Sequence, residues 1–381
     1  MLRDISTALA TELRSLEWRG PRGLEAAEAA ASVTLAVLIA LALHSDEPWW
    51  AAITAFMVTR VAPAAAVERG VMRVLGSMVG AIAALIALSL FVYQSLPFLL
   101  CLFIFACIGS IGFVTSRYGY AWLVGSVTSC LIMLMCFTQP HMAFTTAVDR
   151  VADVMIGTTA SFVVCILSPL PSGTAPGPDA GLLAPPPLAF WRRRYGVDLQ
   201  RWLPGNGALI IHACRGGLAV MLMPALADWI APVSPVTMGV TAVMVMSIPP
   251  TAIVRSDTRV IVLRAVHRFI GCLLGALVGL LILALIGDDF LLWIALIPPG
   301  IWLCSQIQNG TTGISYIGTQ AMFSYLMSMV QGQGPPTTIS PGLERLVGVM
   351  GGLTLLFIVT LVLSLIPRSL PACAPATAAD D

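Results

Sequence analysis

The chain has 381 residues, of which 58% are hydrophobic and only 10% are charged, and its mean hydropathy is +0.91. A soluble globule of this length needs more polar surface, so the composition excludes a water-soluble fold and predicts a membrane protein. All 20 basic residues are arginine and the net charge is +1, which indicates no nucleic-acid partner.

The N-terminal segment, residues 1–25, is interrupted by charges such as Arg3 and Asp4, so it is not a cleavable signal peptide. Its apolar residues instead follow a helical period. We expect a short amphipathic helix on the cytoplasmic face of the membrane, with Ile5, Leu9, Leu13 and Leu16 on one side.

Apolar runs of roughly 17 to 25 residues, the length that a bilayer requires, alternate with polar or Pro/Gly breaks. In the first half they predict helices over 26–43, 48–62, 70–92, 96–114, 119–137 and 148–168. In the second half they predict helices over 208–230, 235–252, 262–286, 290–308, 313–331 and 343–366. The runs 48–62 and 235–252 are short and bounded by proline, so each could be broken or re-entrant.

Arginines gather before the first run and after every second run, whereas the intervening loops carry carboxylates and almost no arginine. By the positive-inside rule, both termini are expected in the cytoplasm. The Pro- and Gly-rich residues 169–207 are predicted to form a cytoplasmic linker, and residues 367–381 a disordered tail.

The chain contains an internal repeat. Residues 69–157 recur 195 positions later without a gap, and residues 53–58 recur 187 positions later. Six predicted helices per half is an even number, so the repeats 26–168 and 208–366 should share one orientation. The predicted fold is therefore an all-α polytopic membrane protein of about 12 transmembrane helices. Its two parallel six-helix repeats are expected to be related by a pseudo-twofold axis along the membrane normal.

One repeated motif combines two arginines with two glycines, at Arg69, Arg73, Gly76 and Gly80 and again at Arg264, Arg268, Gly271 and Gly275. The spacings of 4, 3 and 4 place all four residues on one helix face. The glycines predict close packing against a neighbouring helix, with the arginines at the cytoplasmic mouth. The four arginines could form a funnel that concentrates anions, or they could only satisfy the positive-inside rule.

Two further arginines, Arg150 and Arg345, lie at the predicted outer ends of helices, against the positive-inside trend. Each has a carboxylate beside it, Asp149 or Glu344, and Asp153 follows Arg150 by three positions. The two arginines could flank one outer vestibule that attracts an anion. Alternatively, each could pair with a neighbouring carboxylate and lock helix ends together.

The repeat breaks at two ionisable positions. Glu28 corresponds to Arg215, so the two could pair as a structural clamp or as a gate that opens when Glu28 is protonated. Asp153 corresponds to Gly348, so Asp153 and Glu28 are the carboxylates most suited to couple protons to transport. We find no spacing typical of catalytic residues, a metal site or a cofactor site, and eight of nine cysteines lie in apolar segments. An enzyme is therefore not expected.

These motifs also carry a resemblance. The segment Pro48-Trp49-Trp50, the pair Glu68-Arg69 with its glycines, Tyr118 to Trp122, and Arg150 to Gly157 resemble the fusaric acid resistance family, which includes aromatic acid exporters. The resemblance implies a bacterial inner-membrane protein, an anion path between two six-helix units and a periplasmic membrane-fusion adaptor as partner. Many members carry a large cytoplasmic domain between the halves, which the short linker here replaces.

We therefore expect an inner-membrane exporter of small organic anions, most simply aromatic carboxylates, driven by the proton gradient. The alternatives are a passive anion channel and a non-transporting scaffold of an envelope complex. The expected contacts are the anion and the lipid bilayer, and a homo-oligomer is left open.

Overall fold

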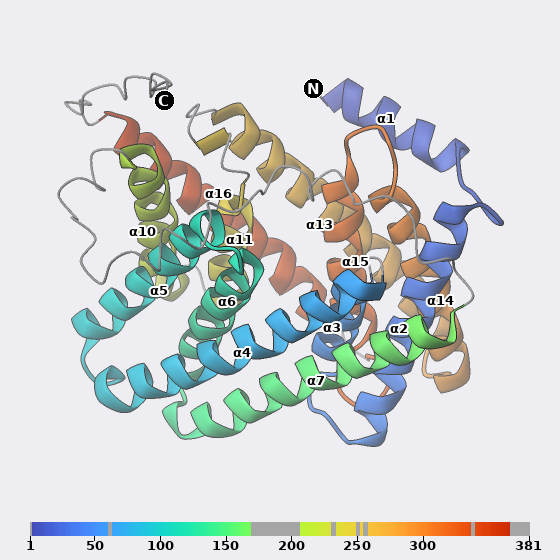
Figure 1. Ribbon diagram of the computed structural model, residues 1–381, viewed down its shortest axis with the longest axis horizontal. Helices are drawn as coiled ribbons and strands as arrows, with labels where there is room; N and C mark the ends of the chain where they lie inside the picture. The colour runs from blue at the N-terminus through green and yellow to red at the C-terminus, as the bar shows by residue number, and fades with distance from the viewer. Residues whose placement is uncertain are drawn as a thin grey trace, which may run out of the picture.

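Figure 1 shows the computed structural model of the chain. The structure describes residues 2–59, 63–168, 206–229, 234–248, 252–253, 258–336 and 340–365. In these ranges the only β pairing is an isolated bridge between Gln331 and Gly334, and the regular structure is otherwise helical. The expected all-helical architecture is confirmed, and its long apolar helices are those of a polytopic membrane protein.

The helices follow the predicted order along the chain. In the first half they are α1 (Leu2–Arg14), α2 (Pro21–Ala42), α3 (Trp49–Thr59), α4 (Pro63–Phe91), α5 (Ser95–Thr115), α6 (Gly119–Cys136), the 3₁₀ turn η1 (Pro140–Met142) and α7 (Ala143–Leu167). In the second half they are α10 (Gly207–Trp229), α11 (Pro235–Met246), α13 (Thr258–Ile286), α14 (Phe290–Gln308), α15 (Ser315–Met329) and α16 (Ser340–Leu365). Most of the predicted linker and the whole predicted tail lie outside the described residues.

Length separates these helices into two groups. Nine of the described helices are long and apolar enough to cross a membrane. The helices α3, α11 and α15 have only 11, 12 and 15 residues. At 1.5 Å per residue they are about 17 to 23 Å long, shorter than the hydrocarbon core of a bilayer. The helix lengths therefore do not give twelve complete membrane spans, although each predicted run overlaps a helix.

The two halves of the sequence do not form separate bundles. Helices α4, α5 and α6 pack with α10, α11 and α16, and we call this group the α5/α10 bundle. Helices α2, α3 and α7 pack with one another, α2 also packs on α14, and α14 packs on α15, which α13 accompanies; we call this group the α2/α14 bundle. Each bundle thus combines helices from both halves. The α5/α10 bundle occupies the left of Figure 1 and α2, α14 and α15 its right.

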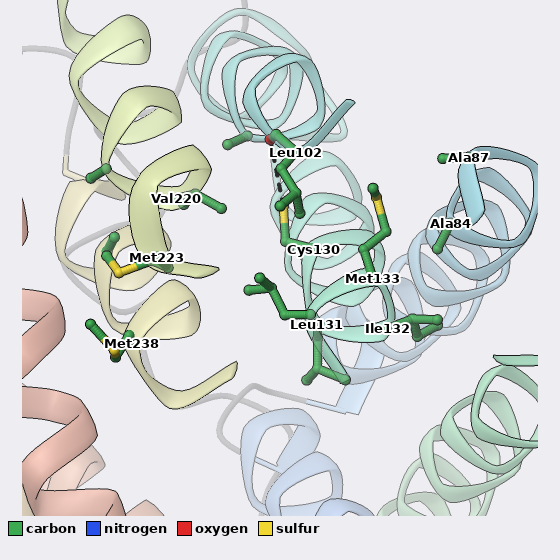
Figure 2. Packing of buried hydrophobic residues seen from close by; sticks show 14 of the residues in the cluster. Ala84, Ala87, Leu102, Cys130, Leu131, Ile132, Met133, Val220, Met223 and Met238 are labelled. Atoms are coloured by element: carbon green, nitrogen blue, oxygen red, sulfur yellow. Dashed lines mark hydrogen bonds between the residues drawn. The ribbon is translucent and has the colours of Figure 1, made fainter. Parts of the chain in front are cut away.

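The core of the α5/α10 bundle illustrates this exchange. Figure 2 shows Val220 of α10 pointing toward the helices that carry Leu102 and Leu131, with Met223 one turn along α10. All four side chains are almost completely buried. Burial of apolar surface in this core therefore requires both halves of the chain.

The repeated glycines pack as the sequence predicts. A Cβ atom at Gly76 would lie 2.5 Å from the carbonyl oxygen of Ala121, and one at Gly80 would collide with the carbonyl of Gly125. In the second half, a Cβ atom at Gly275 would collide with the carbonyl of Ala321. The motif therefore brings α4 against α6 and α13 against α15 at a distance that only glycine allows.

The N-terminal segment packs on the end of α14. The side chain of Arg22 donates through Nε to the carbonyl oxygen of Gln306 at 2.8 Å and through Nη2 to Glu12 at 2.5 Å. Glu12 is 1% exposed and also accepts from the backbone N–H of Thr312 at 2.9 Å. The buried face of α1 therefore lies against protein, beside Ile307 and Ile314.

Candidate anion site

The repeated arginines lie deeper in their helices than expected. Helix α4 begins at Pro63 and α13 at Thr258, several residues before the predicted starts at 70 and 262. Arg73 and Arg268 are therefore ten residues inside their helices, about 15 Å from the first turn. The predicted helix starts are too late in both halves, so the two arginines lie further along their helices than the sequence indicates.

In the first half, Arg73 is held by two hydroxyl groups. Its Nε donates to Thr54 Oγ1 at 3.2 Å, and its Nη1 donates to Tyr120 Oη at 2.7 Å. One turn earlier, the guanidinium of Arg69 lies 4.6 Å from the centre of the Tyr120 ring. Tyr120 therefore contacts both arginines, through its ring face and its hydroxyl group.

The second half repeats this arrangement with one change. Arg268 donates from Nε to Thr241 Oγ1 at 3.2 Å and from Nη1 to Gln320 Oε1 at 2.6 Å. Arg264 lies 4.3 Å from the centre of the Tyr316 ring. Thr54 and Thr241 are related by the same 187-residue offset that relates the short helices α3 and α11. Arg268 is only 1% exposed.

In each half, the hydrogen bond from arginine to threonine crosses between the two bundles. Arg73 belongs to the α5/α10 bundle and its partner Thr54 to the α2/α14 bundle, while Arg268 and Thr241 are placed the other way round. These contacts place Arg73 and Arg268 at the interface of the bundles. Helices α4 and α13 each hold their own pair of the repeated arginines.

Arg150 of α7 is neutralised by a carboxylate that the sequence analysis did not select. Its guanidinium forms an ion pair with Glu47 of the α2–α3 loop and lies 3.7 Å from the centre of the Trp50 ring. The indole N–H of Trp50 donates to the same carboxylate at 3.0 Å. Arg150 therefore forms an ion pair that ties α7 to the α2–α3 loop. Its partner is Glu47 and not the neighbouring Asp149, which is exposed.

Asp153 lies one turn further along α7 and is 2% exposed. It accepts a hydrogen bond from Ser45 Oγ at 2.8 Å and lies close enough to Arg150 to interact with its charge. The α2–α3 loop thus supplies both an acceptor for Arg150 and a donor for Asp153. A carboxylate that precedes a proline and two tryptophans, in the segment Glu47-Pro48-Trp49-Trp50, is the sequence signal that could have identified Glu47.

Arg345 of α16 has a different environment. It is 8% exposed, it contacts the thiol of Cys272, and it lies near the guanidinium of Arg268. Its Nε has no hydrogen-bond partner, and the adjacent Glu344 is exposed. Arg345 therefore faces α13, and none of the groups that surround Arg150 is among its partners.

The structure does not bring Glu28 and Arg215 together. Glu28 lies on α2 beside Ser168, which hydrogen-bonds to it. Arg215 lies on α10 near His212, whose Nε2 is 2.7 Å from the carbonyl oxygen of Met246. Figure 1 shows α2 and α10 on opposite sides of the molecule, so the predicted clamp or gate between the two residues is not formed. The repeat makes the two positions equivalent, but equivalent positions need not be in contact.

No group of three potential metal ligands occurs among the residues that the structure describes. The described part of the α5/α10 bundle contains one cavity of about 20 Å³ next to Gly216 and Ser247. That volume holds about one water molecule.

Two sequence profiles match the chain. The profile of the fusaric acid resistance protein family matches residues 26–178, and that of a fusaric acid resistance protein-like family matches residues 218–359. The matched stretches coincide with the two repeats.

Curated relatives match part of the chain. It is 28% identical over 154 residues to the p-hydroxybenzoic acid efflux pump subunit AaeB of Enterobacter cloacae, and 27% identical to the subunits of the same name in Salmonella paratyphi A and Salmonella arizonae. Each match covers 37% of this chain and 23% of the relative. No solved structure matches the chain significantly.

Proposed function

Because the chain belongs to the fusaric acid resistance protein family, we propose that it exports aromatic carboxylate anions across the bacterial inner membrane, driven by the proton gradient. The names of the relatives, efflux pump subunits for p-hydroxybenzoic acid, support this substrate class. Those relatives are matched over a minor part of their length, so the proposal must rest mainly on the arginines.

The observation that carries the proposal is the set of arginines at the interface between the two bundles. Arg73 and Arg268 are bonded to neutral groups, and Arg69 and Arg264 lie over tyrosine rings. Buried positive charge is costly in a membrane and is retained where it has a use. Guanidinium groups beside aromatic rings are suited to a planar anion, because they offer both charge and a stacking surface.

We propose that transport uses movement of one bundle against the other. One hydrogen bond of each arginine, from Arg73 to Thr54 and from Arg268 to Thr241, crosses the interface, so separating the bundles would break both contacts and free these donors for an anion. Opening first toward one side of the membrane and then toward the other would carry an anion across. Such alternating access by rigid bodies is common in transporters built from repeats.

The pseudo-twofold arrangement of twelve helices belongs to the same proposal. The contacts between halves support it, because α2 packs on α14 while α10 packs on α5, and the repeat exchanges these two pairs. Cytoplasmic termini are supported by the position of α1 and the end of α16, which lie along one edge of the molecule in Figure 1. The three short helices would then line the protein interior, where incomplete spans are tolerated.

Proton coupling is assigned to Asp153. It is buried, it is hydrogen-bonded to Ser45, and it has no counterpart in the second half. Glu28 is a second candidate through its contact with Ser168, without the gate to Arg215. Asp149 and Glu344 are exposed at helix ends and are less suited to the task. A periplasmic adaptor and a homo-oligomer remain proposals that rest on the family resemblance.

A flux assay tests the proposal. The purified chain is reconstituted in liposomes, and uptake of labelled p-hydroxybenzoate is measured with and without an imposed pH gradient. We expect flux that depends on the gradient and that falls in Arg73→Gln without loss of folded protein. Flux without any dependence on the proton gradient would indicate a passive channel. Absence of flux with correctly folded protein would favour a scaffold.

A further inference from the structure

The two halves treat one pair of equivalent arginines differently. Arg150 and Arg345 are related by the 195-residue offset, but the partners of Arg150 are missing from the second half. Glu47 is replaced by Ser234 at the 187-residue offset, and Asp153 is replaced by Gly348. Ser234 nevertheless lies beside α16, because its carbonyl oxygen is 3.7 Å from the position of a Cβ atom at Gly348.

Arg345 consequently lacks a neutralising partner and lies near Arg268. Among the residues that the structure describes, no carboxylate pairs with either guanidinium. Arg268 has Thr241 and Gln320 as partners, both neutral, and Arg345 has the thiol of Cys272. Two buried cations close together repel each other and lose hydration, so the site is costly without an anion.

We propose that Arg268 and Arg345 together bind the carboxylate group of the transported anion, with Thr241 and Gln320 orienting Arg268. This assignment rests on the proposed function and adds that the second half of the chain holds the site. The unpartnered Nε of Arg345 supplies a free donor for the ligand. Two guanidinium groups can present parallel N–H donors to both oxygens of a carboxylate.

The site also explains how binding would act on the bundles. Arg345 belongs to α16 in the α5/α10 bundle and Arg268 to α13 in the α2/α14 bundle. An anion between them would attract both bundles and offset the repulsion between the arginines. A ligand that binds the closed interface more tightly than the open one shifts the equilibrium toward closure. The first half has an internal carboxylate in the same role, in the form of Glu47.

The first test measures binding of benzoate and p-hydroxybenzoate to the purified full chain by isothermal titration calorimetry. In Arg345→Gln we expect the dissociation constant to rise about tenfold or more, because a charge-assisted contact is lost. Arg268→Gln should have an effect of similar size. Wild-type affinity in both variants would overturn the assignment, as would chloride binding with the same affinity as benzoate.

The second test restores the missing carboxylate. Ser234→Glu places an acidic side chain where Glu47 holds Arg150, so it should compete with the ligand for Arg345 and weaken benzoate binding about tenfold. The matched control Ser234→Gln has the same size without the charge and should bind as wild type does. Equal affinity of the two variants would contradict the proposal even if Arg345→Gln failed to fold.

These outcomes distinguish failure of the proposed function from failure of the site assignment. If the wild-type chain neither binds nor transports aromatic carboxylates, the proposed function fails. If the wild-type chain transports them while Arg345→Gln, Arg268→Gln and Ser234→Glu keep wild-type affinity, only the assignment of this site fails.

Discussion

The first and second halves of the chain share their helix packing but differ in how they neutralise charge. The glycines of α4 and α13 press on the backbones of α6 and α15 in the same way. In contrast, Arg150 has Glu47 and Asp153 nearby, whereas Arg345 has Cys272 and Arg268. Packing between backbones tolerates few changes, because any side chain at the contact collides. A charge network can be altered by two substitutions.

The first prediction tests the helix packing that the two halves share. Gly80→Ala and Gly275→Ala should each destabilise the folded chain by about 3 kcal/mol, because the added methyl group collides with a backbone carbonyl. The apparent melting temperature in detergent should fall by the same amount in both variants. Gly334→Ala is the control, since nothing lies within 4 Å of its added Cβ atom. A loss in only one half would show that the packing is not equivalent.

The second prediction concerns the neutralisation of charge, in which the two halves differ. Glu47→Gln leaves Arg150 without its ion pair and should cost about 2 kcal/mol, the value of a hydrogen bond to a charged group. The counterpart Glu344→Gln changes an exposed carboxylate and should leave the unfolding transition unchanged. Fluorescence-detected unfolding of both variants measures the difference. Equal stability of the two variants would remove the asymmetry between the halves.

The third prediction is a change in folding stability that has opposite signs in the two halves. Without ligand, Arg345→Gln should stabilise the chain by about 1 kcal/mol, because it removes a buried charge that has no carboxylate partner. Arg150→Gln should destabilise it, because Glu47 and Asp153 lose their counter-charge. Ligand-free melting curves of the two variants decide the point. Destabilisation by Arg345→Gln would mean that Arg345 has a structural partner.

The smallest expected effect concerns the N-terminal segment, which packs on α14 of the second half. Burial alone would raise the pKa of Glu12, but hydrogen bonds from Thr312 and Arg22 hold that pKa below its ordinary value of 4.5. A lowered pKa contributes stability above the ordinary value and loses it as pH falls through the value in the folded chain. Amide hydrogen exchange in α1 should therefore accelerate below pH 4.5, and Glu12→Gln should abolish this dependence. Unchanged exchange across this range would contradict the role of Glu12.

Helix positions could be predicted from the sequence because apolar runs of bilayer length are local features. The starts of α4 and α13 were predicted too late, since charged residues near the beginning, Glu68 and Arg69 in α4 and Arg259 in α13, interrupt the apolar pattern. The packing role of the glycines followed from their spacing. The exchange of helices between halves could not be predicted, because a repeat does not say which copy a helix face contacts.

The arginine positions were also selected correctly as unusual, but their partners were not. Glu47 lies 103 positions from Arg150, and no local pattern links them. Glu28 and Arg215 were linked by the repeat alone, which relates equivalent positions that symmetry keeps apart. Distances between residues that are remote in sequence depend on the packing of the bundles.

The mixing of both halves in each bundle has a consequence for synthesis and for ancestry. When the first half leaves the ribosome, the faces of α5 and α6 that α10 and α11 will cover are still without partners. Those helices must wait in the lipid until the rest of the chain is inserted. An ancestor encoded by a single copy of the repeat would have met the same need by dimerising with its twin, each protomer lending helices to the other. Fusion of two such copies would place that exchange within one chain, where each copy is free to keep a different residue at the position of Glu47 and Ser234.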